Sequence, residues 1–158
     1  SILAKIGNAI AWIFAPLGWG TWQAAVASIT GLVAKENIVG TLGILYGGGD
    51  LTVYQNIAAA FTGITGYSFL VFNLLCAPCF AAIGAIKREM NNAKWTWFAI
   101  GYQCGFAYVV ALMINQFGNA FTGSLNIIGL IAALAALAMI VYMLVRPYKE
   151  ATKLSAKV

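Results

Sequence analysis

Four long apolar stretches constrain this sequence more than any other feature. They are Trp19–Tyr46, Tyr67–Ile86, Trp95–Ile114 and Ile127–Val145. Each has roughly the 20 residues that an α-helix needs to cross the hydrocarbon core of a bilayer. Hydrophobic residues make up 62% of the 158 and charged residues 8%, whereas soluble domains average about 45–50% and about 25%. The sequence therefore predicts an all-α, polytopic helical membrane protein with four transmembrane helices.

Two shorter helices are expected outside these spans. Apolar residues recur at helical spacing between Ser1 and Pro16, but about 12 to 14 residues are too few to cross a bilayer. We expect an N-terminal helix that lies at the membrane interface and ends at Pro16 and Gly18. In the outer loop from Gly47 to Gly66, Asp50 is a candidate cap for a short helix that continues through Phe61.

The basic residues predict the orientation of the spans. Lys87, Arg88 and Lys94 lie between the second and third spans, and Arg146, Lys149, Lys153 and Lys157 follow the fourth. The other two loops, residues 47–66 and 116–126, contain no lysine or arginine. Because cytoplasmic loops are enriched in these residues, the basic segments are predicted to be cytoplasmic. Four crossings then place both ends of the chain, including Lys5, on that side.

Glu36 is the most informative polar residue, because an ionisable side chain within a span is costly and is usually retained for function. Lys35 precedes it, but adjacent helical side chains do not face each other. One interpretation is that Glu36 lines an ion path. The other is that Lys35 and Glu36 form structural pairs with partners on other helices. Gly40 and Gly43 share the face of Glu36, so we expect close packing and easy local unwinding there.

The second span carries Cys76, Pro78 and Cys79. Proline has no N–H, so it leaves the carbonyl of Leu74 without its helical partner and predicts a kink. A free carbonyl beside a thiol is a plausible station for a soft or borderline divalent cation. The alternative is that the cysteines, including Cys104, are small packing residues. Gly101 and Gly105 lie four apart in the third span and predict close helix approach.

Several classes of function are excluded or disfavoured by absences. The chain has no histidine and no phosphate-binding loop of the G-x-x-x-x-G-K-S/T type, so neither a Ser/His/Asp or Cys/His catalytic arrangement nor nucleotide hydrolysis is expected here. The net charge of +5 resides mainly in loops that flank spans, which indicates membrane topology and no nucleic-acid partner. We expect a transporting chain that is not itself an enzyme and has no cofactor of its own.

Short motifs that extend over nearly the whole chain carry a family resemblance. They are Phe14–Gly18, Trp22–Ala24, Gly31–Leu42, Ala77–Cys79, Ala85–Glu89 and Trp95–Val109. Together they resemble the second Gate region of FeoB, a family of bacterial ferrous iron transport proteins. The Ala-Lys-Glu and Gly-Thr-Leu motifs around Glu36 and the Pro-Cys motif at Cys79 are the most specific parts.

This resemblance implies that residues 1–158 form the C-terminal transmembrane Gate domain of a longer protein that takes up Fe(II) across the bacterial cytoplasmic membrane. It also implies an N-terminal GTPase domain, which binds GTP and Mg, and a first Gate region, both absent from this chain. Implied partners are lipid, Fe(II), the rest of the polypeptide and the small protein FeoA, and we also expect a homo-oligomer. Cys79 and Glu36 are expected to line the iron path. Second-tier candidates are Asn37, Thr41, Asn73, Cys76 and Gln103.

Two other functions compete with iron transport. One is that of another Gate-type membrane protein, either a nucleoside permease or a sporulation-associated protein, which should not need the Pro-Cys motif. The other is that of a scaffold that transports nothing, in which Glu36 and Cys79 would tolerate isosteric replacement.

Overall fold

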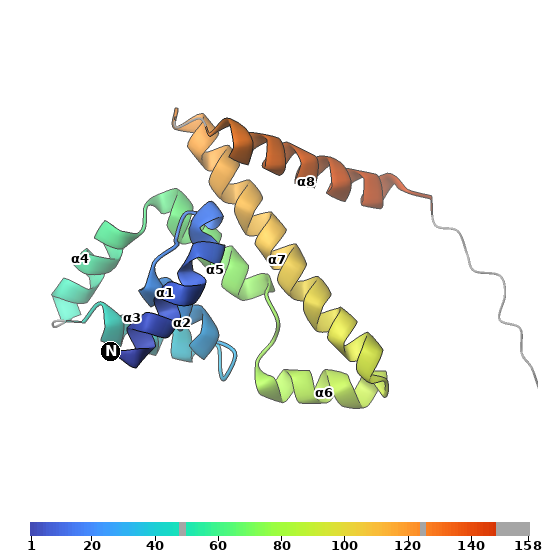
Figure 1. Cartoon of the computed structure of the whole chain (residues 1–158), viewed down its shortest axis with the longest axis horizontal. Coiled ribbons are helices and arrows are strands. Elements are labelled where there is room, and N and C mark those ends of the chain that lie inside the picture. Colours follow the sequence, from blue (N-terminus) through green and yellow to red (C-terminus); the bar gives the residue numbers. More distant parts are fainter. Residues whose placement is uncertain (48–49, 124–125, 148–158) are drawn as a thin grey trace, which may run out of the picture.

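The computed structural model describes residues 1–47, 50–123 and 126–147, and the regular elements within these ranges are all helical (Figure 1). They are α1 (Ile2–Phe14), the 3-10 turn η1 (Ala15–Leu17), α2 (Trp22–Thr30), α3 (Asn37–Leu45), α4 (Asp50–Ala60), α5 (Gly63–Leu75), α6 (Phe80–Met90), α7 (Ala93–Phe121) and α8 (Ile127–Val145). The described part of the chain contains no strand, so the predicted all-α class is confirmed.

Local sequence accounts for several of the helix ends. The hydroxyl of Thr21 accepts a hydrogen bond from the Ala24 N–H at the start of α2, and Thr62 and Thr65 form a reciprocal capping box at the start of α5. Such caps satisfy N–H groups that have no partner within the helix. Gly18 ends η1 with φ at 90°, a left-handed conformation that glycine adopts without steric cost.

The core lies where α5 packs along α7 and both contact η1, and buried residues of α2 belong to the same cluster. Trp19 and Leu17 are fully buried there, and Trp19 stacks on Phe14 with ring centroids 4.5 Å apart. Small alanine side chains of α2 and of α7 belong to this buried cluster. This core therefore fixes the position of the N-terminal segments against the long helix α7.

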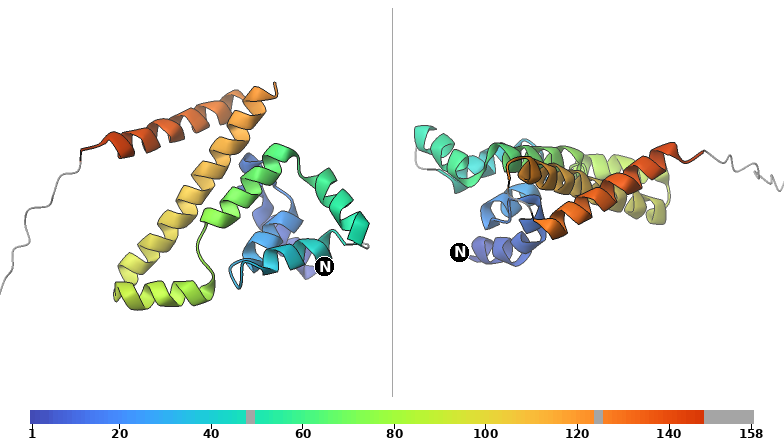
Figure 2. Two further views of the ribbon diagram at one scale, coloured as in Figure 1. Left: turned by 180° about the vertical axis from the view of Figure 1, so that it is seen from behind. Right: turned by 90° about the horizontal axis from the view of Figure 1, so that it is seen from above.

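The C-terminal helix α8 packs on α7 near their junction and is otherwise mostly exposed in the part of the chain that the structure describes. It folds back from the end of α7, and the two helices diverge in Figures 1 and 2. Large apolar side chains along it are exposed, including Ile128 at 80% and Leu144 at 80%. A helix with such a surface requires lipid or another protein segment around it.

The sequence predicts four membrane spans, whereas the structure gives a range for their number. Two helices, α7 and α8, are long and apolar enough to cross a membrane. Two bent pairs also qualify if each is counted as one span: residues 2–17 with 22–30, bent by 97°, and residues 52–60 with 63–75, bent by 94°. The chain therefore has two to four candidate spans, and these bent pairs differ from the first two predicted spans.

Neither of the first two predicted spans is a continuous helix. Trp19–Tyr46 is divided into α2 and α3 by a break at residues 31–36, and Tyr67–Ile86 is divided into α5 and α6 by an extended segment at residues 76–79. The kink predicted at Pro78 is thus a complete break. Cys76 and Cys79 both have extended backbone angles, with ψ at 171° and 162°. The physical reason for the break is Pro78, which has no N–H for the helix and disfavours a helical conformation in the residue before it.

The other element predictions have mixed outcomes. The fourth span coincides with α8, and the short loop helix is present as α4. The helix predicted for residues 1–16 is also present, as α1. In contrast, α7 continues to Phe121, so most of the predicted outer loop 116–126 is helical. The capping side chain of Asp50, and Lys149, Lys153 and Lys157, lie outside what the structure describes.

Candidate functional site

Two helix breaks lie against each other and form the candidate site. The first is the segment 31–36 between α2 and α3, and the second is the segment 76–79 between α5 and α6. The backbone N–H of Phe80 donates to the carbonyl of Leu32 at 2.9 Å. The ammonium of Lys35 donates to the carbonyls of Asn73 at 2.6 Å and Leu74 at 3.2 Å. Residues 38 to 48 positions apart in the sequence are therefore joined at two places.

The chemistry of Pro78 explains why carbonyls are available at the second break. The last carbonyls of any helix lack intrahelical partners, and Pro78 has no N–H to offer Leu74. The C-terminal end of α5 also carries the negative end of the helix dipole, which favours a cation. The predicted free carbonyl of Leu74 is therefore present, and in this structure Lys35 is its partner.

Glu36 and Asn37 lie at the start of α3, and both are exposed. Glu36 makes no side-chain capping hydrogen bond. Within the described residues it forms no ion pair with Lys35, whose ammonium instead contacts backbone oxygens of α5. The carboxylate of Glu36 is therefore exposed and is not held by Lys35 in the described part of the chain.

Thr41 joins the two sides of the first break. Its hydroxyl lies 2.9 Å from that of Thr30, which also donates to the carbonyl of Ala27 at 2.9 Å. Since the proton of Thr30 is used in that bond, Thr41 is the donor in the pair of hydroxyls. This contact holds α3 against the end of α2.

The cysteines lie at different positions around the second break, and all three are free thiols. Cys79 is half-buried and precedes α6. Cys76 is also half-buried, and its sulfur lies 3.6 Å from the carbonyl of Asn73. Cys104 on α7 is exposed. The structure thus brings Cys76 next to the carbonyl that Lys35 contacts.

Two of the candidate residues, Asn73 and Gln103, have a buried amide oxygen without a hydrogen bond. Asn73 is 6% exposed, and its Nδ2 donates to the carbonyl of Phe69 while its Oδ1 has no partner. The Oε1 of Gln103 on α7 is likewise unpaired. An unpaired buried oxygen costs free energy unless it meets a donor, water or cation.

The glycine pairs do not make the predicted contacts. No atom lies within 4 Å of a side chain built on Gly40, Gly43, Gly101 or Gly105. The predicted tight packing is therefore not found within the described chain: Gly105 faces the cavity between α7 and α8, and nothing packs closely against the other three glycines there. The face of α3 beside Glu36 is instead open.

No group of three or more His, Cys, Asp or Glu side chains lies together in the residues that the structure describes. Cys79 and Glu36 belong to opposing breaks but are not part of a closed metal centre. The two opposing breaks present backbone oxygens, one unpaired amide oxygen and thiols.

A second set of helix-end carbonyls, in the last turn of α1 and in η1, was not predicted from the sequence. Four side chains of α5 and α7 donate to it: Ser68 to Leu17 at 3.0 Å, Tyr108 to Ile13 at 2.7 Å, and Asn115 and Gln116 to Pro16 at 3.0 and 3.1 Å. The available signal was the presence of polar residues within or beside apolar spans next to a proline-terminated helix. The sequence also did not predict that Lys35 donates hydrogen bonds to the carbonyls at the end of α5.

Comparison with known proteins adds three findings. The model of the Gate family, described as nucleoside recognition, matches residues 1–93. The chain is 43% identical over 119 residues to the Fe(2+) transporter FeoB of Methanocaldococcus jannaschii, a match that covers 75% of this chain and 18% of that protein. It is 37% identical over 121 residues to the Fe(2+) transporter FeoB of Staphylococcus aureus, with 77% and 18% covered.

A third relative is the Fe(2+) transport protein A/Fe(2+) transporter FeoB fusion protein of Porphyromonas gingivalis. It is 32% identical over 136 residues, with 77% of this chain and 16% of that protein covered. The chain therefore spans less than a fifth of the length of the relatives it matches. No solved structure matches it.

Proposed function

Because the chain belongs to the Gate family, and specifically resembles the Gate region of FeoB, we propose that it forms part of the path by which Fe(II) crosses a membrane. In the proposed setting, the whole protein takes up Fe(II) across the bacterial cytoplasmic membrane, with both ends of this chain on the cytoplasmic side. A GTPase domain elsewhere in that protein drives or gates the movement. The chain itself transports and does not catalyse.

The observation that carries this proposal is the contact between the two helix breaks. Broken helices expose backbone oxygens inside membranes, where transporters use them to coordinate ions. Here the carbonyls of Asn73 and Leu74 already hold a positive charge, that of Lys35. Because these carbonyl oxygens bind an ammonium, they also present the negative partial charge that would bind a metal cation.

The side chains around the breaks supply the preference for iron. Fe(II) accepts both oxygen and sulfur ligands, and thiolates favour it over magnesium or calcium. In this proposal Cys79 contributes sulfur from the second break and Glu36 contributes a carboxylate from the first. Asn37, Thr41, Asn73, Cys76 and Gln103 are secondary candidates along the same path.

The partners proposed are lipid, the remainder of the polypeptide, the small protein FeoA and further copies of the protein. Support for FeoA comes from the fused relative, whose name joins Fe(2+) transport protein A to FeoB. Support for lipid or protein around α8 comes from its exposed apolar surface.

Fe(II) uptake by cells that express the intact protein tests the proposal. We expect Cys79→Ser and Glu36→Gln each to lower uptake by about tenfold or more, since each removes one ligand of a transiently bound ion. The matched controls are Cys104→Ser and Glu89→Gln, which alter the same residue types at exposed positions. Uptake that is unchanged in both test variants, at equal membrane abundance, would contradict the assigned path.

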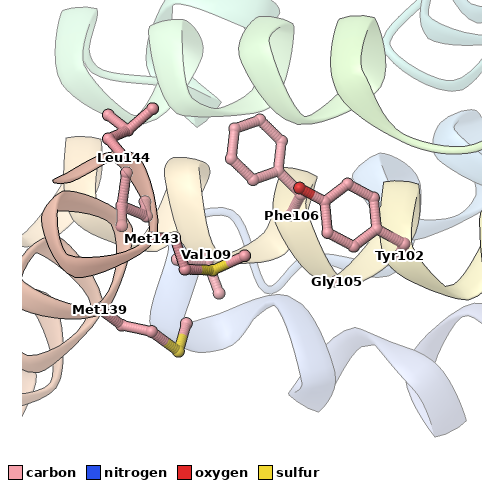
Figure 3. Close-up of a pocket in the computed structure, with 8 residues that line it drawn as sticks. Tyr102, Gly105, Phe106, Val109, Met139, Met143 and Leu144 are labelled. Atoms are coloured by element: carbon pink, nitrogen blue, oxygen red, sulfur yellow. The ribbon is translucent and has the colours of Figure 1, made fainter. Parts of the chain in front are cut away.

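The family description keeps nucleoside recognition as a second candidate, and one cavity allows it to be examined. A cavity of about 700 Å³ lies between α7 and α8 (Figure 3). It is lined by Tyr102, Gly105, Phe106, Val109, Met139, Ile140, Met143 and Leu144. Only the hydroxyl of Tyr102 offers a polar side-chain atom, whereas a nucleoside needs several such groups to be oriented. Fe(II) transport is therefore better supported by the geometry.

A further inference from the structure

Lys35 occupies the position where the second helix break presents its oxygens. Its ammonium contacts the carbonyls of Asn73 and Leu74, and the sulfur of Cys76 approaches the first of these carbonyls. The contact at 2.6 Å is short for a hydrogen bond from an ammonium to a carbonyl. A charge that belongs to the protein thus fills a cation position.

The surroundings would attract a cation even without Lys35. The two carbonyls are at the C-terminal end of α5, where the helix dipole is negative. Oδ1 of Asn73, on a side chain that is only 6% exposed, has no hydrogen-bond partner. One amino acid therefore offers both a carbonyl bound to Lys35 and a second oxygen that is still unsatisfied.

Lys35 is also placed so that it can leave. It lies in the non-helical segment between α2 and α3, where its side chain is half-buried and its carbonyl accepts a turn hydrogen bond from the Ile38 N–H at 3.2 Å. The side chain can therefore move without unwinding a helix. Its four-carbon stem is flexible, and an ammonium is a compact point charge without the fixed geometry of a guanidinium. Release would cost the two hydrogen bonds, which a divalent ion bound to the same oxygens would replace.

We propose that Lys35 is a tethered cation that closes the ion path when no metal is bound and is displaced when a divalent cation binds the oxygens of Asn73 and Leu74. Lys35 therefore acts as a specificity-determining residue: a cation passes only if it competes with the ammonium for these carbonyls. The identity of the ion as Fe(II) rests on the proposed function, but the displacement does not.

Lysine reactivity in the unaltered protein tests the displacement directly. The intact protein in detergent is labelled briefly with acetic anhydride, with and without Mn²⁺ as the divalent probe, and each lysine is quantified by mass spectrometry. Because a hydrogen bond to a charged group changes an equilibrium constant by about tenfold or more, we expect labelling of Lys35 to rise by about tenfold with Mn²⁺. Labelling of exposed Lys5 is expected to stay constant.

A variant gives a second measurement. Lys35→Met keeps the length of the side chain and removes the competitor, so we expect Mn²⁺ to bind about tenfold more tightly, with Lys5→Met as the matched control. Unchanged Lys35 labelling on Mn²⁺ binding would overturn the proposal, as would equal or weaker Mn²⁺ binding by a folded Lys35→Met protein. If that variant does not fold, the labelling result decides.

The two proposals fail in different ways. If the wild-type protein moves no Fe(II) but Mn²⁺ exposes Lys35, the iron path is wrong and the tethered cation stands. If the protein moves Fe(II) and Lys35 labelling does not respond to divalent ions, the path stands and Lys35 is only a structural link between the two breaks.

Discussion

Replacement of Gly18 by alanine is expected to destabilise the protein more than the same replacement at Gly123, which shares its backbone conformation. Gly18 has φ at 90°, and a left-handed conformation costs a residue with a Cβ about 1–2 kcal/mol. The added Cβ would also lie 2.7 Å from Cγ2 of Thr65 and would overlap Oδ1 of Asn115. Overpacking of this kind typically costs about 1–3 kcal/mol.

The neighbours of Gly18 have little freedom to move away. Nδ2 of Asn115 donates to the carbonyl of Pro16 at 3.0 Å, so a shift of this side chain would break a hydrogen bond at the same turn. Thr65 is part of the capping box of α5. The two contributions therefore add, and we expect Gly18→Ala to lower the free energy of unfolding by about 2–5 kcal/mol.

Gly123→Ala is the matched control, because Gly123 also has φ at 90° but no atom within 4 Å of a built Cβ. It should cost only the conformational part, about 1–2 kcal/mol. Chemical unfolding of the intact protein in detergent, followed by circular dichroism, measures the difference. If both variants lose the same stability, the close approach of Gly18 to α5 and α7 is not as described, and the reasoning is refuted.

Two further substitutions test individual hydrogen bonds. Thr41→Val removes the hydrogen bond to Thr30 across the first break, so we expect a loss of about 1 kcal/mol in stability and reduced Fe(II) uptake. Thr41→Ser keeps the hydroxyl and should keep wild-type stability and uptake. Equal uptake by the two variants would contradict a role for the hydroxyl. Ser68→Ala removes a buried donor to Leu17 and should cost about 1–3 kcal/mol in chemical unfolding. Ser28→Ala is its control, because that buried hydroxyl has no partner; similar losses for both serines would argue against the Ser68 contacts.

The parts of the fold that depend on local sequence could be predicted. Ile127–Val145 has no polar side chain before Tyr142 and is flanked by Asn126 and Arg146, so its length and ends are set by composition alone. The short helix of the loop and the interruption at Pro78 also follow from nearby residues. In each case the interactions that determine the structure are between residues only a few positions apart in the sequence.

The first break could not be located in this way. The glycines suggested unwinding near Gly40 and Gly43, but α3 is helical through both. The chain breaks at residues 31–36, where Leu32 and Lys35 find hydrogen-bond partners in the segment 73–80. Those partners lie about 40 positions away, so no local propensity indicates them.

The candidate site was predictable in part. The free carbonyl of Leu74 follows from the missing N–H of Pro78, and the structure shows it in use. Its partner, Lys35, could be recognised from the sequence only as a neighbour of Glu36, because side-chain contacts between distant segments cannot be read from spacing. The roles of Cys79 and Glu36 in an ion path stay predictions.

The pairing of α5 with α7 gives a measure of depth along the membrane normal. Gly118 packs on Ile64, and the hydroxyl of Ser68 lies 3.0 Å from the carbonyl oxygen of Ala111, so the two helices run in opposite directions. Ala111 is about 25 Å along α7 from Lys94 at 1.5 Å per residue. Asn73 lies five residues beyond Ser68 and is therefore about 18 Å from the level of Lys94.

Where α7 crosses a bilayer along its axis, with Lys94 at one boundary, that level is close to the midplane of a hydrocarbon core about 30 Å thick. A lysine at the centre of a bilayer costs about 2.5–3.5 kcal/mol on insertion scales. The carbonyls of Asn73 and Leu74 are the groups that offset this cost. An ion that displaces Lys35 would thus enter the site at the point where the bilayer opposes charge most strongly.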